Sequence, residues 1–169
     1  MKRLAITLAA ASALALTGCA KKPPAQLPPA PEQGNNEGAQ LPPSGGAVPG
    51  SEEHFKSVMN GRDVIYFDTD KYDIDSDDAA ALRQQAQYLL QYAQIRATIE
   101  GHCDERGTRE YNIALGDRRA NAAKNYLISL GVPAGRLTTV SYGKERPVAL
   151  GSDEQAWAQN RRAVTVVLQ

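Results

Sequence analysis

The chain has 169 residues and no formal net charge at pH 7, which bounds it to one ordinary domain with additional segments. The zero net charge gives no global indication of nucleic-acid binding. The first fifty residues hold four basic and two acidic side chains, so residues 51–169 carry fifteen basic and seventeen acidic groups, a net charge of about −2. This mixed charge is typical of a soluble surface, and the 42% apolar content is sufficient for a core of about a hundred residues.

The N-terminus has the pattern of an export signal that ends at a cysteine. A short basic start precedes an apolar run over residues 4–16, which is shorter than the about twenty residues needed to span a bilayer. The sequence Leu-Thr-Gly-Cys at 16–19 then resembles the bacterial lipobox, which implies cleavage of a signal peptide, 1–18, and lipid on Cys19. Because Ala20 rather than Asp follows the cysteine, the resemblance implies sorting to the outer membrane. An ordinary signal peptide with a chance cysteine is the alternative.

Residues 19–50 form the predicted lipidated N-terminus and a tether. The segment is rich in Pro, Gly, Gln and Asn and nearly free of large apolar side chains, so it cannot bury enough surface to offset its ordering entropy. We expect a disordered linker that reaches roughly 90 Å when extended and about 30 Å as a flexible coil. A Pro-rich ligand for a recognition domain is the weaker alternative, because no sustained PxxP pattern with flanking charges is present.

From Ser51 onward, strand-like and helix-like patterns alternate, and we assign residues 51–169 to one domain. The predicted strands cover residues 63–67, 97–102, 137–142 and 163–168. The predicted helices begin at Ser76, with a buried face of Leu82, Ala86, Leu89, Leu90 and Ala93, at Thr108, ending near Leu130, and at a capping box over 152–155, running through Trp157. The alternation predicts an α/β two-layer domain with helices on one face of a small sheet.

The segment 101–120 carries the most informative pattern. Asp104 comes just after a predicted strand, and Arg119 lies inside the helix that follows. Gly107 allows a sharp turn between them, and Thr108 is a plausible N-cap. Strand ends that face helix starts are common places for sites in α/β domains. The alternative is that Asp104 and Arg119 form a structural salt bridge that ties strand to helix.

This segment resembles the OmpA-like C-terminal domain family, which includes the C-terminal half of outer-membrane protein A and flagellar stator proteins. The family pattern of Gly-His-x-Asp, a Gly, Asn-x-x-Leu and Arg-Ala is matched at Asp104, Gly107, Asn112, Leu115, Arg119 and Ala120. Further matches lie at 66–72, 141–145 and 160–162, and the resemblance covers about residues 52–169. The departures, Cys103 and Gly116, are both small residues. The resemblance implies a βαβαβ domain with helices packed on one face of a small mixed sheet.

The resemblance also implies non-covalent binding of peptidoglycan through the meso-diaminopimelate of its peptide stems. Asp104 would take the ammonium of that residue, and Arg119 would take its carboxylate through a planar fork. Asp70 and Thr69 are carried over from the loop after the first strand, and Leu115 would line the pocket against the ligand's methylene groups. No cofactor is implied, and no metal is expected because His54, the only other histidine, is far from His102 in the sequence.

The same resemblance, with the lipobox and tether, implies an outer-membrane lipoprotein of the Tol system. Such a protein would tether the outer membrane to the cell wall and support envelope integrity and constriction during cell division. TolB and other Tol-system proteins would be partners, over a surface that overlaps the wall site. A wall hydrolase or amidase is the rival function. It is disfavoured because the sequence holds no Gly-x-Ser-x-Gly motif, His-Glu-x-x-His motif or credible pair of catalytic carboxylates.

Several neighbouring residues receive structural expectations. Arg118 is predicted to be a solvated charge, His102 a core or hydrogen-bonding residue, and Cys103 a small buried thiol. Whether Lys144, Arg161 and Arg162 line the site or a partner surface is left open. Finally, Asp104→Ala and Arg119→Ala are each expected to abolish retention on cell wall while the domain stays folded.

Overall fold

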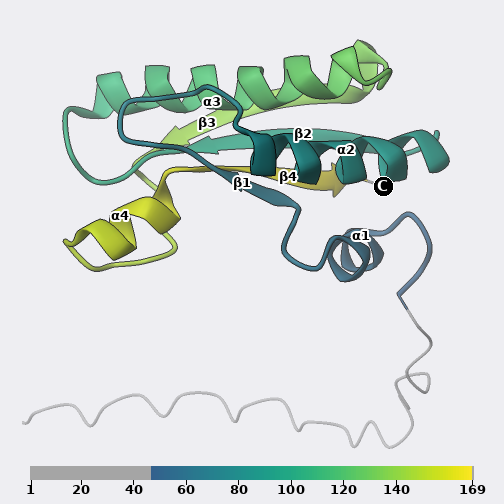
Figure 1. The fold of residues 1–169 in the computed structure, drawn as a ribbon, viewed down its shortest axis with the longest axis horizontal. Helices are drawn as coiled ribbons and strands as arrows, with labels where there is room; N and C mark the ends of the chain where they lie inside the picture. The colour runs from purple at the N-terminus through teal and green to yellow at the C-terminus, as the bar shows by residue number, and fades with distance from the viewer. Residues whose placement is uncertain (1–46, 169) are drawn as a thin grey trace, which may run out of the picture. The chain divides into compact units, whose positions relative to one another are not determined.

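The computed structural model describes residues 47–168, so the predicted signal peptide 1–18, Cys19 and nearly all of the predicted tether lie outside the described residues. The elements follow in the order α1 (Glu52–Met59), β1 (Val64–Tyr66), α2 (Ser76–Gln91), β2 (Arg96–His102), α3 (Arg109–Ser129), a 3-10 turn (Ala134–Arg136), β3 (Leu137–Gly143), α4 (Glu154–Asn160) and β4 (Arg162–Leu168) (Figure 1). None of the helices in this part of the chain combines the length and the apolar character needed to cross a bilayer.

The four strands form one mixed sheet in the order β1-β4-β2-β3. Strand β4 is antiparallel to both β1 and β2, whereas β2 and β3 are parallel. Strands β1, β2 and β3 therefore run in the same direction, and the loops that follow them gather at one edge of the sheet (Figure 1). The predicted two-layer architecture with a mixed sheet is confirmed.

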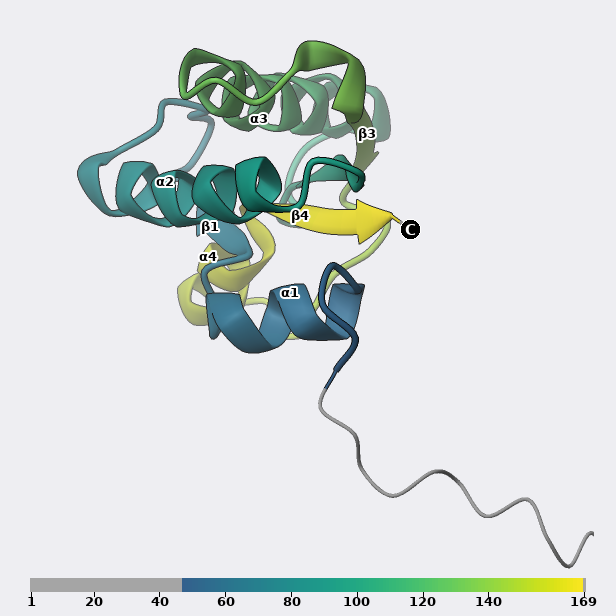
Figure 2. The same ribbon diagram turned by 90° about the vertical axis from the view of Figure 1, so that its right-hand side faces the viewer.

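Helices α2 and α3 pack on one face of the sheet (Figure 2). Because side chains alternate between the faces of a strand, every second residue of the central strands is buried beneath these helices. The buried set on the strands comprises Ala97, Ile99, Ala163, Thr165 and Val167, and Leu82, Leu89 and Leu127 meet them from the helices. The alternate positions Thr98, Glu100, Val164 and Val166 are only half-buried on the opposite face.

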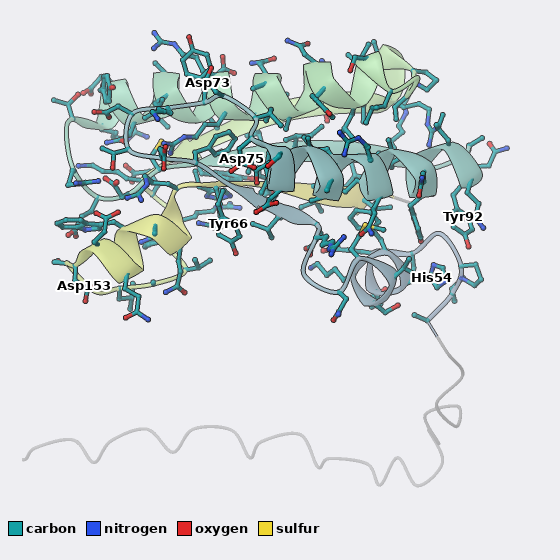
Figure 3. All side chains as sticks on the ribbon, in the orientation of Figure 1. His54, Tyr66, Asp73, Asp75, Tyr92 and Asp153 are labelled. Atoms are coloured by element: carbon teal, nitrogen blue, oxygen red, sulfur yellow. The ribbon has the colours of Figure 1, made fainter. Side chains whose placement is uncertain are left out.

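Helix α1 was not predicted from the sequence. The Ser51 side chain caps it by accepting a hydrogen bond from the backbone of His54, and Phe55 and Met59 are buried in the core. The helix is also tied to α2, since His54 Nδ1 lies 2.7 Å from the hydroxyl of Tyr88 and its ring meets that of Tyr92 edge-on at 5.7 Å (Figure 3). These contacts extend the core beyond the short strand β1.

Two details of the sequence interpretation were wrong. Leu90 is exposed although it lies within α2, because the buried face there is formed by Tyr88 and Leu89. Ala93 is exposed because it lies beyond the end of the helix at Gln91. The cap of α4 is Asp153 and not the first residue of the predicted capping box, and the helix continues to Asn160. A carboxylate is favoured at this end over a neutral hydroxyl because it meets the positive end of the helix dipole.

Candidate ligand-binding site

The site begins where β2 and α3 come into backbone contact. A Cβ atom on Gly101 would overlap the carbonyl oxygen of Gly116, and one on Gly116 would lie 2.9 Å from the carbonyl oxygen of Gly101. Only glycine allows two backbones to approach this closely. The pair thus brings the end of β2, which leads into Asp104, beside the part of α3 that carries Arg119.

The loop between β2 and α3 is held by side chains from outside it. Gly107 adopts a φ of +82°, and Thr108 caps α3 by accepting a hydrogen bond from Tyr111, as predicted. Asn112 Nδ2 donates to the carbonyl oxygens of Arg106 and Thr108 at 2.7 and 2.9 Å. Lys144 Nζ, whose place the sequence left open, donates to the loop carbonyls of Glu105 and Gly107. The loop backbone is therefore fixed before any ligand arrives.

All five residues predicted to contact the ligand line a single cavity of about 260 Å³. The lining comprises Thr69, Asp70, Cys103, Asp104, Arg106, Gly107, Tyr111, Asn112, Leu115 and Arg119. It draws on the loop after β1, the end of β2 and the first turns of α3, which are segments far apart in the sequence. The fold therefore brings residues that are distant in the sequence into one cavity.

Asp104 is buried and holds its charge through two guanidinium groups. Arg106 Nη2 lies 2.6 Å from Asp104 Oδ2, and Arg161 Nη1 lies 3.5 Å from the same oxygen. Burial alone would raise the pKa of the Asp104 carboxyl, but the hydrogen bonds from Arg106 more than offset it, so the pKa lies below its usual value. Asp104 is consequently an anion in a largely desolvated position.

Arg119 forms the floor of the cavity, with none of its surface exposed. Its guanidinium donates to three backbone carbonyls, those of Lys71, His102 and Asp68, at 2.9, 2.9 and 3.0 Å. Burial lowers the pKa of Arg119 from that of a free guanidinium. A guanidinium has five N–H groups, so these bonds leave two for another acceptor.

Within residues 47–168, no hydrogen bond or ion pair joins Asp104 to Arg119. The alternative of a structural salt bridge between them is therefore not what the structure shows. Each is held by other groups instead, and the cavity separates the two.

The loop after β1 supplies the rim. Asp70 has a φ of +57°, a left-handed conformation that is uncommon for a residue other than glycine, and its Oδ1 accepts a hydrogen bond from the Tyr111 hydroxyl at 3.2 Å. Thr69 Oγ1 accepts one from Arg106 Nη2 at 3.2 Å. Unusual backbone of this kind persists where the surroundings hold it, and it is common at binding sites.

Two lining residues, Arg106 and Tyr111, were not predicted from the sequence, and the role of Arg161 was left open. Arg106 adjoins the Asp104 motif, so its position after the acid was the available indication. Arg161 lies more than fifty residues away in sequence, and only the fold brings it to Asp104. Arg162 is buried and donates to backbone carbonyls of Asn160 and Arg146, away from the cavity lining.

His102, Cys103 and Arg118 behave as expected. Burial and the charges of Arg162 and Arg146 lower the pKa of His102 to about 4, so its ring is neutral at pH 7 although Glu100 Oε2 lies 3.4 Å away. Burial raises the pKa of the Cys103 thiol to about 11, and its Sγ donates to the Asn112 carbonyl. Arg118 is exposed. Among residues 47–168 no cluster of three potential metal ligands occurs.

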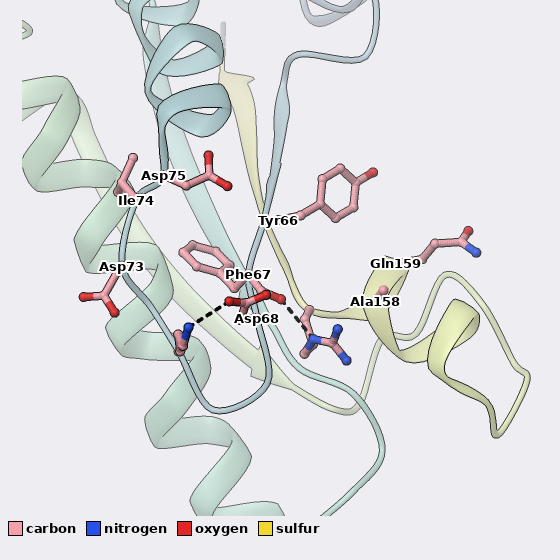
Figure 4. Close-up of a pocket in the computed structure, with 10 residues that line it drawn as sticks. Tyr66, Phe67, Asp68, Asp73, Ile74, Asp75, Ala158 and Gln159 are labelled. Carbon is pink, nitrogen blue, oxygen red and sulfur yellow. Dashed lines mark hydrogen bonds and ion pairs between the residues drawn. The ribbon is translucent and has the colours of Figure 1, made fainter.

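A larger cavity of about 480 Å³ opens between the β1–α2 loop and α4 (Figure 4). It is lined by Tyr66, Phe67, Asp68, Lys71, Asp73, Ile74, Asp75, Ala158, Gln159 and Arg161, none of which is a predicted ligand contact. Three of its charges are already engaged, because Lys71 Nζ pairs with Asp68 Oδ2 at 2.9 Å and Asp75 caps α2. The smaller cavity is the better candidate site, because it holds all five residues predicted to contact the ligand.

Comparisons with known proteins identify the family of the chain. The model of the OmpA family matches residues 66–161. The chain is 50% identical over 163 residues to a peptidoglycan-associated lipoprotein of Rhizobium meliloti (strain 1021), covering 96% of this chain and 86% of the relative. It is 48% identical to the protein of that name from Brucella melitensis, covering 98% and 92%.

Solved structures give the same result. The crystal structure of the peptidoglycan-associated lipoprotein from Burkholderia pseudomallei shares 50% identity and a TM-score of 0.61, covering 62% of this chain and 89% of that one. The OmpA-like domain of FopA1 from Francisella tularensis, at 21% identity and a TM-score of 0.54, shows the shared fold alone. The chain therefore belongs to the OmpA family, beside the members named peptidoglycan-associated lipoproteins.

Proposed function

We propose that the domain binds peptidoglycan non-covalently, by clasping the free end of meso-diaminopimelate in its peptide stems. The observation that carries this proposal is that a buried carboxylate, Asp104, and a buried guanidinium, Arg119, line one cavity without pairing with each other. The free end of that residue carries an ammonium and a carboxylate on one carbon, so it presents the two complementary charges together. The role is binding and not catalysis.

Each wall of the cavity has a part in this proposal. Asp104 accepts the ammonium, and the two remaining N–H groups of Arg119 take the carboxylate. Leu115, which is 3% exposed, faces the ligand's methylene groups, while Thr69 and Asp70 form the polar rim. Because Arg119 has no exposed surface, the side chains around it must shift slightly before the ligand's carboxylate reaches its guanidinium.

The zwitterion sets the selectivity. A ligand that lacks one charge leaves its protein partner desolvated and unpaired. Each charge-assisted hydrogen bond contributes about 1.5 to 3 kcal/mol, so a single site has modest affinity and remains reversible. A lipid anchor would compensate by raising the local concentration of wall peptides around the domain.

The test uses the chain from Ala20 onward, which contains every residue that the structure describes. Asp104→Asn keeps the size of the side chain and removes its charge, and Asp117→Asn on the exposed side of α3 is the matched control. Retention on purified cell wall should fall about 10- to 150-fold for Asp104→Asn and stay unchanged for the control. Circular dichroism checks that both variants are folded, and full retention by folded Asp104→Asn would reject the proposal.

We also propose that the chain is an outer-membrane lipoprotein, anchored through Cys19 after removal of residues 1–18, with 19–50 as a tether and 51–169 as the wall-binding domain. Two or more acyl chains give stable membrane attachment. Cys19→Ser should move the protein from the membrane fraction to the soluble fraction. It should also abolish the incorporation of labelled palmitate. Continued labelling of Cys19→Ser would contradict the lipobox assignment.

We further propose that the protein acts in the Tol–Pal system with TolB as a partner. In this role it would support envelope integrity and constriction during division. The proposal is that TolB covers part of the wall site. Soluble peptide containing diaminopimelate should then compete with TolB for the domain. Simultaneous, independent binding in a titration would show that the two surfaces do not overlap.

A further inference from the structure

Arg106 covers the carboxylate that the proposed function assigns to the ligand's ammonium. Its Nε lies 3.2 Å from Asp104 Oδ1 and its Nη2 lies 2.6 Å from Oδ2, so the guanidinium forks over both oxygens. The same Nη2 reaches Thr69 Oγ1 on the opposite rim at 3.2 Å. On its other side the guanidinium stacks over the ring of Trp157, 4.2 Å from the centroid.

We propose that Arg106 is an internal competitor for the ligand: its guanidinium occupies Asp104 in the empty site and leaves when the ligand's ammonium binds. This inference rests on the proposed function and adds a residue that sets the affinity of the site. It makes binding an exchange of one cation for another on a single carboxylate.

Of the three arginines near the cavity among the described residues, Arg106, Arg119 and Arg161, Arg106 is the least constrained. Its side chain is 39% exposed, whereas that of Arg161, the other partner of Asp104, is 7% exposed. Arg161 is also held by the Phe67 carbonyl and by Glu154. Arg119 is fixed by three backbone carbonyls.

The charges around Asp104 favour the exchange. Asp104 already faces two guanidinium groups, and an added ammonium would place three cations around one buried carboxylate. Like charges at such distances repel strongly when little water screens them. The release of Arg106 from Asp104, and with it from the ring of Trp157, restores the original balance of two cations around the carboxylate.

The backbone of this loop should keep its conformation when the Arg106 side chain is released. The backbone N–H of Arg106 donates to Asp104 Oδ1 at 3.1 Å, so the turn keeps this bond whatever the side chain does. Its carbonyl is held by Asn112 Nδ2 at 2.7 Å. A truncation to Ala therefore removes the competing guanidinium and leaves the positions of Asp104 and the loop backbone in place.

The first experiment measures affinity by calorimetry, using the chain from Ala20 onward with Arg106→Ala. The matched control is Arg109→Ala, because Arg109 is a neighbouring exposed arginine that pairs with Glu145 outside the cavity lining. The probes are stem tripeptides ending in meso-diaminopimelate, in lysine, which keeps the ammonium and lacks the carboxylate, or in 2-aminopimelate, which keeps the carboxylate and lacks the ammonium.

Removing the competitor should tighten both ammonium-bearing peptides by the same factor, roughly two- to tenfold, because the displaced contact is partly exposed. Affinity for the 2-aminopimelate peptide should not rise, since that ligand displaces nothing from Asp104. Arg109→Ala should change none of the three. Weaker or unchanged binding of the diaminopimelate peptide by Arg106→Ala would overturn the inference.

A second readout follows the guanidinium itself. Trp157 is the single tryptophan of the chain, so its emission reports the stacked Arg106 directly. Adding the diaminopimelate peptide should shift the emission of the unaltered protein, and Arg106→Ala should show almost no shift although it binds more tightly. An equal shift in both proteins would show that Arg106 does not leave the ring.

The two proposals fail in different ways. If Asp104→Asn binds the diaminopimelate peptide as well as the unaltered protein does, the proposed function itself is wrong. If Asp104→Asn loses binding and Arg106→Ala loses it too, the wall site stands and Arg106 is a direct contact of the ligand in place of a competitor.

Discussion

Gly101 and Gly116 place β2 and α3 in direct backbone contact, beside the cavity that holds Asp104 and Arg119. The contact fixes how far the end of the strand lies from the helix, and with it the separation of the two charged groups. Gly116, which departs from the family pattern, lies at the closest point of this approach. The close approach of the two backbones therefore requires a residue without a Cβ atom at position 116.

A methyl group at Gly101 should disturb both the fold and the site. Gly101→Ala places a Cβ on the Gly116 carbonyl, where only backbone can yield, and overpacking of this kind costs about 1 to 3 kcal/mol or more. Gly135→Ala is the control, since nothing lies within 4 Å of its Cβ position. Urea unfolding should separate the two variants clearly, and equal stability would contradict the packing argument.

Arg119→Ala should destabilise the domain, which differs from the sequence-based expectation that the fold survives this change. The substitution leaves buried carbonyl oxygens without their donors, and each such group costs about 1 to 3 kcal/mol. We expect a loss of at least about 3 kcal/mol in the free energy of unfolding. Arg118→Ala, one residue away and exposed, should stay within about 0.5 kcal/mol.

Denaturant midpoints of the two arginine variants give this comparison. Equal midpoints would mean that Arg119 is free for ligand binding alone. Because Arg119 has this structural duty, the loss of wall binding in Arg119→Ala cannot be assigned to the ligand contact, and Asp104→Asn is the sharper test of function.

The domain should lose stability as the pH falls from about 6.5 to 4, partly through His102. Its pKa is about 4 in the folded protein, below the 6.5 of a free histidine side chain, so the unfolded chain binds more protons in this range and protonation favours unfolding. The contribution is fully present above pH 6.5 and amounts to about 3 kcal/mol at most.

His102→Phe removes this titration and keeps a ring beside Tyr142. Neither ring nitrogen of His102 has a hydrogen-bond partner among the described residues, so the replacement breaks no such bond. Unfolding free energies measured between pH 4 and 7 should fall less steeply for His102→Phe than for the unaltered protein. Parallel curves would show that His102 is not the group responsible.

Cys103 should react slowly with thiol reagents in the folded protein. Only the thiolate is nucleophilic, and a pKa of about 11 leaves very little of it at pH 8. Burial, with 3% of the residue exposed, blocks access as well. The chain from Ala20 onward has Cys103 as its only thiol, so labelling with a disulfide reagent in buffer and in denaturant measures the protection, and rapid labelling in buffer would contradict it.

The sequence determined the elements whose patterns are local. The buried positions Leu82, Ala86 and Leu89 of α2, the cap at Thr108 and the turn at Gly107 depend on neighbours within a few residues, and they were predicted correctly. The family motif likewise named the residues that line the cavity. Helix α1 was not predicted, because its two buried side chains, Phe55 and Met59, are too few to establish a helical period of apolar residues.

Only the tertiary structure decided which groups of the protein those residues contact. It placed Arg161 against Asp104, gave Arg119 to three backbone carbonyls, and set Arg106 between Asp104 and Trp157. The physical reason is that charges pair according to distance in space, which the sheet order and the close packing of Gly101 on Gly116 establish, and no spacing along the chain encodes that distance.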